Sequence, residues 1–158
     1  MADFLVHFAT AFVPARGLRD GRLRAILYVG VCLPDLLFKG LLYLGGASTW
    51  ACEPTHAPLT LVPLCYAAAL LFEEEWRRRA FWALLAGSCL HLLLDVGKSY
   101  TGAGVIPWGF PLTMNRVETG CYLPEDTLLM MAPALGLILL TEAVSRLIRR
   151  RASASPRP

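Results

Sequence analysis

A histidine and an aspartate lie four residues apart in the apolar stretch CLHLLLDVGKSY, residues 89–100. On a helix, His91 and Asp95 would share one face, one turn apart. An imidazole and a carboxylate are costly in apolar surroundings, so such residues usually face the interior of a helix bundle and indicate a function. The pair therefore predicts a polar site inside a hydrophobic helical protein.

The remaining histidines and the acids of the apolar segments are the natural partners of this pair. The chain has three histidines, and each lies in or beside an apolar segment. A helix rises about 1.5 Å per residue, so His7, Asp35 and His91 are expected at a similar height, roughly 14–18 Å from the basic end of their segments. Imidazole nitrogen and carboxylate oxygen are ligands of zinc, and they also suit manganese and iron. We therefore expect one divalent metal, most simply zinc, bound by the set His7, Asp35, His56, His91 and Asp95.

Each of these residues also has a structural explanation when it is taken alone. His7 could lie at a membrane interface, and Asp35, which follows Leu33-Pro34, could cap or kink a helix. His56 could cap the segment that follows it, while His91 and Asp95 could form a hydrogen-bonded pair within a core. A shared metal site explains all of them at once.

Further candidates lie after the pair, in the stretch that precedes the last apolar segment. The sequence LPEDT contains Glu125 and Asp126, either of which could act as a general base or metal ligand, or could only begin a helix. Asp95 is a third candidate base. An anionic substrate could be bound by Lys98, Tyr100 and Trp108, for which anchoring at a membrane surface is the alternative.

The composition indicates the class of protein that must position these residues. Of the 158 residues, 56% are hydrophobic and 17% are charged, and the mean hydropathy is +0.51, which is more apolar than a typical soluble domain. We expect an all-α integral membrane protein, with a soluble helical protein of very apolar core as the alternative. The five cysteines lack a CxxC spacing, so a thiolate zinc site is not expected. Cys52 and Cys121 could form a disulfide or remain thiols.

Four apolar segments are near or just below the length of about 20 residues that crosses a bilayer. They are residues 25–44, 58–72, 80–96 and 127–144, and a shorter piece at residues 4–13 predicts a re-entrant or interfacial helix. We expect a single helical domain over residues 1–145 and a basic, disordered cytoplasmic tail over residues 146–158. The charged run at 73–79 predicts a turn between the second and third segments, although one helix over 58–96 would also satisfy its spacing of opposite charges.

The basic residues predict the orientation of this bundle. Arginines gather before the first segment, between the second and third, and after the fourth, which is one side of a four-span arrangement. The positive-inside rule places that side, with both termini, in the cytoplasm. The loops at residues 45–57 and 97–126 are then expected outside.

Several short motifs together resemble a known family. They are a histidine in an N-terminal apolar helix, LPD at residues 33–35, TH at 55–56, HLLLD at 91–95 and VIPWGFP at 105–111. In this order they resemble the YdjM-type family of bacterial and archaeal inner-membrane metal-dependent hydrolases, which is distantly similar to zinc-dependent phospholipase C, an all-helical fold. The resemblance covers about residues 3–112 and implies that His7, Asp35, His56, His91 and Asp95 are metal ligands. Family members often have a second acid and a histidine where this chain has Leu37 and Phe38.

The predicted function is a membrane-embedded metal-dependent hydrolase of a prokaryotic inner membrane. A bound metal would activate water, and the site inside the bilayer favours a lipid or other amphiphilic phosphoester as substrate. The lipid bilayer is the expected partner, and no nucleic acid is expected. The alternatives are a metal- or proton-binding transporter component, or a non-catalytic assembly protein whose polar cluster holds helices together.

Overall fold

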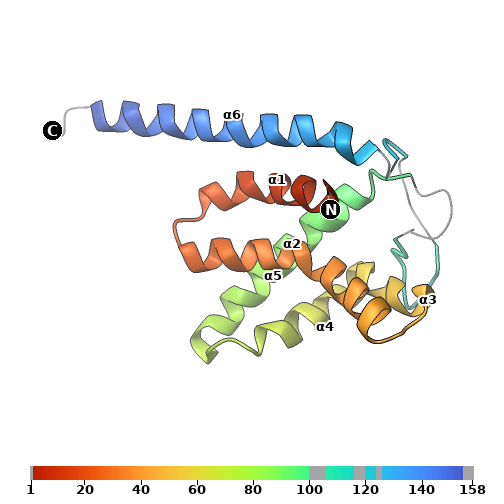
Figure 1. The fold of residues 1–158 in the computed structure, drawn as a ribbon. Helices are drawn as coiled ribbons and strands as arrows, with labels where there is room; N and C mark the ends of the chain where they lie inside the picture. The colour runs from red at the N-terminus through yellow and green to blue at the C-terminus, as the bar shows by residue number, and fades with distance from the viewer. Residues whose placement is uncertain (1, 100–105, 116–119, 124–125, 155–158) are drawn as a thin grey trace.

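The computed structural model describes residues 2–99, 106–115, 120–123 and 126–154. Within these residues the chain is helical, apart from loops and one isolated bridge between Lys98 and Tyr122 (Figure 1). The helices are α1 (Ala2–Gly17), α2 (Gly21–Lys39), α3 (Thr49–Cys52), α4 (Pro58–Ala69), α5 (Glu74–Asp95) and α6 (Thr127–Ala154), with a π-helical turn η1 (Gly40–Leu44) and a 3₁₀ turn η2 (Glu53–His56). The predicted all-α class is confirmed.

The residues at the starts of the helices explain where they begin. The side chain of Asp20 accepts a hydrogen bond of 2.8 Å from the Arg22 N–H, which caps α2. Pro58 occupies the first position of α4, where its missing N–H costs nothing. Glu74 and Glu75 lie in the first turn of α5, where acids interact favourably with the helix dipole.

The crossing of α2 and α5 is the most extensive helix contact of the fold. Gly30 of α2 faces the backbone of Leu84, and Gly87 of α5 faces the backbone of Leu27 and Val31. Small residues at a crossing allow two helix backbones to approach closely, as in membrane helix pairs. This contact fixes the position of α2 relative to α5.

A buried hydroxyl group reinforces the crossing. Ser88 Oγ donates a hydrogen bond of 2.9 Å to the carbonyl oxygen of Gly30, and the Ser88 side chain is fully buried. Ser88→Ala would leave that carbonyl without its side-chain donor, so we expect the free energy of unfolding to fall by about 1 kcal/mol. Thermal unfolding in detergent would measure this, with Thr141→Ala as a control because the Thr141 hydroxyl bonds only within its own helix, to Leu137. Equal melting temperatures for the Ser88→Ala variant and the wild type would contradict the prediction.

A hairpin joins α4 to α5. The Leu70, Leu71 and Phe72 N–H groups close the last turn of α4 on the carbonyls of residues 66–69, and the Glu73 carbonyl then accepts the first bond of α5, from Trp76. The predicted turn between the second and third apolar segments is confirmed, and the alternative of one helix over 58–96 is wrong. The turn lies at residues 70–73, however, and most of the charged run forms the first turns of α5.

Helix α6 is longer than the last apolar segment predicted. It continues to Ala154, through most of the stretch that was expected to be a disordered tail from residue 146. Arginine favours helices, and the Arg146 Nε atom lies 3.0 Å from Glu142 Oε1, one turn earlier. These two effects extend the helix beyond the apolar residues, and the tail prediction is corrected accordingly.

Two helices are long and apolar enough to cross a membrane. They span Gly21–Leu44, which joins α2 to η1, and Leu129–Arg150 within α6, and only 28% and 6% of their most apolar windows are buried in the protein. Leucines of both helices, such as Leu44, Leu129 and Leu139, are therefore exposed, which is compatible with lipid contact. Helix α4 has 12 residues and α5 begins with charged residues, so membrane crossing by these two helices stays a prediction.

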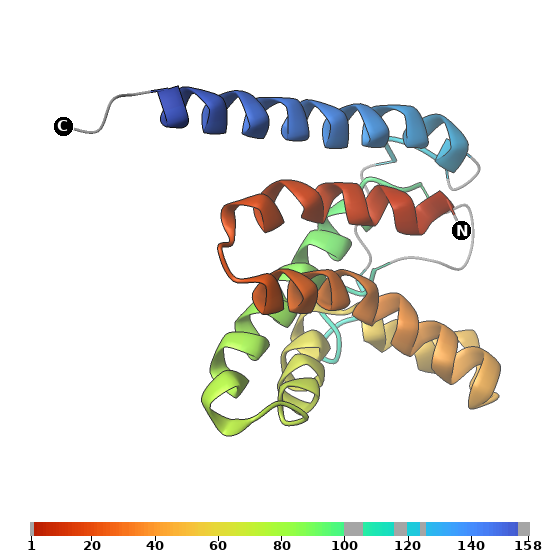
Figure 2. The same ribbon diagram turned by 60° about the vertical axis from the view of Figure 1, so that its left-hand side comes forward.

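The ends of the helices divide the molecule into two sides. Figures 1 and 2 show that the α1–α2 connection, the α4–α5 connection and the C-terminal end of α6 lie at the same end. These are the three arginine-rich segments. The segment joining α2 to α4 lies toward the opposite end (Figure 1). Cys52, which is buried, and Cys121, which is exposed, are not joined by a disulfide.

Candidate metal centre

The structure brings together the five residues that the sequence proposed as ligands. His7 comes from α1, Asp35 from α2, His56 from the end of η2, and His91 and Asp95 from α5. They form two overlapping groups of potential ligands, one of His7, His91 and Asp95 and one of Asp35, His56 and His91. Within each group, one ligand atom from every residue lies within 4.8 Å of the others. Segments distant in the chain therefore converge on one cluster, as expected.

His91 and Asp95 on α5 form the most deeply buried part of the cluster. His91 Nε2 lies 3.0 Å from Asp95 Oδ2, across one helical turn, and the two side chains are only 2% and 4% exposed. His7 approaches from α1, with its Nε2 atom 3.3 Å from the other carboxylate oxygen, Asp95 Oδ1. The His7 ring also stacks on the His91 ring, with centroids 4.1 Å apart. Both oxygens of Asp95 therefore face an imidazole.

Asp35 and His56 form the more accessible side. His56 Nε2 lies 3.4 Å from Asp35 Oδ1, and these side chains are 15% and 14% exposed. The same Asp35 oxygen is 3.8 Å from His91 Nε2, and His56 Nε2 is 3.9 Å from Asp95 Oδ2. A small molecule would therefore reach the cluster from the side of Asp35 and His56.

The tautomer of His91 follows from its second ring nitrogen. His91 Nδ1 lies 2.8 Å from the backbone carbonyl oxygen of Val31 on α2. A carbonyl can only accept, so Nδ1 carries the proton and donates it. In the neutral ring, Nε2 then presents a lone pair to the carboxylates of Asp35 and Asp95, and this nitrogen is buried without a hydrogen bond among the described residues. Such a carbonyl partner is typical of a metal-binding histidine, whose orientation it fixes.

The same reasoning applies to His56. Thr55 Oγ1 donates its proton to the Cys52 carbonyl at 2.8 Å and also lies 3.1 Å from His56 Nδ1. Because the hydroxyl proton is already used, His56 Nδ1 must donate to Thr55 Oγ1. His56 Nε2 is then unprotonated in the neutral ring, and its lone pair faces Asp35 Oδ1. Two imidazole lone pairs thus face carboxylate oxygens, an arrangement that requires either a proton or a metal ion between them.

The spacing of these atoms fits a metal ion. A tetrahedral site with ligand bonds of about 2.0–2.1 Å separates neighbouring ligand atoms by roughly 3.3–3.5 Å. The nitrogen–oxygen separations in the cluster run from 3.0 to 3.9 Å. His91 belongs to both groups of ligands, and one imidazole nitrogen can bind only one ion. The described residues therefore suit a single divalent cation better than two.

Two lysines balance the acids of the cluster. Lys39 Nζ lies 2.7 Å from Asp35 Oδ2, on the oxygen that does not face the histidines, and its side chain is 45% exposed. Lys98 is buried, and its ammonium group contacts Asp95 Oδ1. Asp35 therefore has a lysine on one oxygen and imidazoles on the other, whereas Asp95 Oδ1 faces both Lys98 and His7. The position of Lys39, four residues after Asp35, is the sequence signal that could have assigned it to the site.

The other predicted site residues lie apart from this cluster or outside the description. Asp126 precedes α6, and its Oδ2 atom accepts a hydrogen bond of 3.0 Å from the Leu123 N–H. Trp108 is partly exposed, in the turn that follows Ile106. Tyr100 and Glu125 lie outside the described residues. A base role for Asp126 and a substrate contact for Trp108 stay predictions.

Comparison with known proteins found no match. No family model matches the chain, and neither a curated protein nor a solved structure matches it significantly. The assignment of function therefore depends on the cluster itself.

Proposed function

We propose that this chain is a membrane-embedded metal-dependent hydrolase that acts on a phosphoester of a lipid or another amphiphilic molecule. The observation that carries the proposal is the pair of imidazole Nε2 lone pairs, on His56 and His91, that face carboxylate oxygens at metal-ligand spacing. An assembly protein would satisfy such buried groups with hydrogen-bond donors. The arrangement instead favours a cation as the missing partner.

Zinc is the metal that we propose for this site. Imidazole and carboxylate together suit zinc, and manganese and iron(II) accept the same ligands. When bound, such an ion would polarise a phosphoester and lower the pKa of water in the site. His91, His56, Asp35 and Asp95 would hold it, and His7 would hold Asp95 through its other oxygen.

The charges around the cluster support an anionic substrate. The accessible side is formed by Asp35 and His56, and the half-exposed Lys39 ammonium lies beside Asp35 there. A phosphoester that enters from this side would meet Lys39 before it reaches the cluster. Lys98 places a second positive charge at the buried side, next to Asp95. Both oxygens of Asp95 would then be occupied, Oδ2 by the metal and Oδ1 by His7 and Lys98, so another group would accept the proton of the attacking water.

The membrane setting of the proposal depends on the two apolar helices. We propose four spans, with the arginine-rich end in the cytoplasm of a prokaryotic inner membrane and with loops 45–57 and 97–126 outside. The common position of the three arginine-rich segments at one end supports this orientation. The resemblance of the short motifs to the YdjM-type family is consistent with the same activity.

Metal content and hydrolysis test the proposal together. We expect the full chain, purified in detergent, to contain about one divalent ion per molecule, as a site with one shared histidine requires. It should hydrolyse bis(p-nitrophenyl) phosphate or a short-chain phospholipid, and a chelator should abolish the reaction until the metal is restored. A chain with bound metal that hydrolyses neither compound would favour the transporter alternative. A chain without metal would favour an assembly role.

A further inference from the structure

A second polar site lies at the arginine-rich end, apart from the metal cluster. A hollow of about 340 Å³ opens between the α1–α2 connection and the C-terminal half of α6. Its wall contains four arginines, one each from α1, the α1–α2 connection, α2 and α6, together with a serine and two apolar residues. The lining residues are Arg16, Leu18, Arg19, Arg24, Ser145, Ile148 and Arg149.

The arginines of this hollow outnumber the acid that contacts them. Glu142 of α6 contacts the Arg16 guanidinium and lies 3.7 Å from Arg149 Nη2. Arg24 Nη2 donates to the backbone carbonyl of Arg19 at 3.3 Å. The Arg149 side chain is 64% exposed and Arg19 is also exposed, so their guanidinium groups are accessible from the hollow. Guanidinium groups form strong hydrogen bonds with phosphate oxygens, so the hollow suits a ligand with several anionic oxygens.

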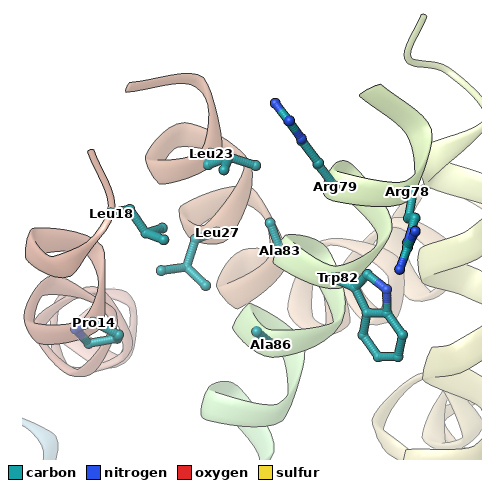
Figure 3. A pocket seen from close by; sticks show the side chains of 9 residues that line it. All are labelled: Pro14, Leu18, Leu23, Leu27, Arg78, Arg79, Trp82, Ala83 and Ala86. Carbon is teal, nitrogen blue, oxygen red and sulfur yellow. The ribbon is translucent and has the colours of Figure 1, made fainter. Parts of the chain in front are cut away.

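The surroundings of the hollow favour a lipid phosphate over a free anion. One wall is α6, whose Leu129–Arg150 stretch is long and apolar enough to cross a membrane. Leu18 also lines a second hollow of about 550 Å³, which is mostly apolar (Figure 3). Its lining includes Leu23 and Leu27 of α2 and Trp82 of α5, together with two further positive charges, Arg78 and Arg79. The acyl chains of a lipid could pack against this apolar surface beside the arginines. A soluble anion has no apolar part that would use the surface. Basic pockets between membrane helices on the cytoplasmic side typically bind anionic lipid headgroups.

We propose that this hollow binds one anionic phospholipid, with its phosphate among Arg16, Arg19, Arg24 and Arg149. The lipid would join α6 to the α1–α2 connection, since its arginines come from both. The site differs from the metal cluster in position and in chemistry, because guanidinium groups bind anions and the cluster binds a cation. Its occupancy can therefore be measured whether or not the hydrolase proposal holds.

Lipid titration of the full chain in detergent tests the proposal. Dioctanoyl phosphatidylglycerol should bind in one copy by native mass spectrometry and raise the melting temperature, whereas dioctanoyl phosphatidylcholine and inorganic phosphate should have little effect. Arg24→Gln with Arg149→Gln removes two of the charges and leaves the Arg16–Glu142 pair in place. Because each arginine near a membrane surface contributes substantially to the attraction of anionic lipid, we expect affinity to fall about tenfold or more. Arg24→Lys with Arg149→Lys should retain most of it.

A control with the same loss of charge separates a site from general attraction. Arg22→Gln with Arg77→Gln removes two arginines at the same end that do not line the hollow, and affinity should change less than about twofold. Equal losses in the two double variants would overturn the proposal. So would equal binding of phosphatidylcholine, or displacement of the lipid by millimolar inorganic phosphate, which would assign the hollow to a soluble anion. The melting temperature of each lipid-free variant shows that the comparison uses folded protein.

Discussion

His91→Ala is expected to purify without bound metal and to lose hydrolysis, the largest effect that a single side chain of the cluster should have. His91 belongs to both groups of ligands, and its Nε2 atom lies 3.0 Å from Asp95 Oδ2 and 3.8 Å from Asp35 Oδ1. Losing a residue that only orients a metal ligand typically lowers metal affinity 10–100-fold. Loss of a ligand itself should therefore lower affinity by about a hundredfold or more. Metal analysis after dialysis and zinc titration with a competing chelator would measure the change.

Ser88→Ala is the matched control for that experiment. Ser88 lies one turn before His91 on α5, is equally buried, and also bonds a backbone carbonyl of α2. It offers no ligand to the cluster, so the Ser88→Ala variant should keep its metal while it loses some stability. If His91→Ala retained the metal of the wild type, the cluster would not be the metal site. If both variants lost it equally, helix packing rather than ligation would explain the result.

The candidate ligands could be recognised from the sequence because their residue types are rare in this chain. Three histidines and a few acids in apolar segments must be buried or paired, and the four-residue spacing of His91 and Asp95 places them on one helical face. The sequence could not show that the Val31 carbonyl orients His91, because this contact joins residues 60 positions apart. Nor could it show that Thr55 orients His56, since the geometry of η2 decides that bond.

The positions of the helices agree with the apolar pattern of the sequence, but the residues at which they end depend on charges and hydrogen bonds as well. The turn after α4 was predictable from the charged run, because those residues cannot cross a bilayer cheaply. The end of α6 was not, since the predicted apolar segment ends at Val144, whereas arginines and an ion pair to Glu142 extend the helix to Ala154. The π-helical turn η1, which follows Lys39, had no signal in the apolar pattern.

Gly87→Ala is expected to damage both the fold and the metal centre. A Cβ atom at Gly87 would lie 2.7 Å from the Val31 backbone nitrogen and closer still to the Leu27 carbonyl oxygen. These are backbone atoms of α2 that cannot rotate away, so the two helices must separate. Overpacking of this kind costs about 3 kcal/mol of the free energy of unfolding. Because α2 carries Asp35 and α5 carries His91, metal affinity should fall as well.

Gly136→Ala shows whether the loss at Gly87 comes from contact rather than from the change of residue type. Gly136 lies inside α6, and a Cβ atom there would meet nothing within 4 Å. Alanine favours a helix over glycine by about 0.5–1 kcal/mol, so this variant should be as stable as the wild type or slightly more stable. Melting temperatures in detergent and zinc affinities of the two variants make the comparison. Wild-type stability for Gly87→Ala would mean that α2 and α5 do not touch at this crossing, and the convergence of Asp35 on His91 would lose its structural basis.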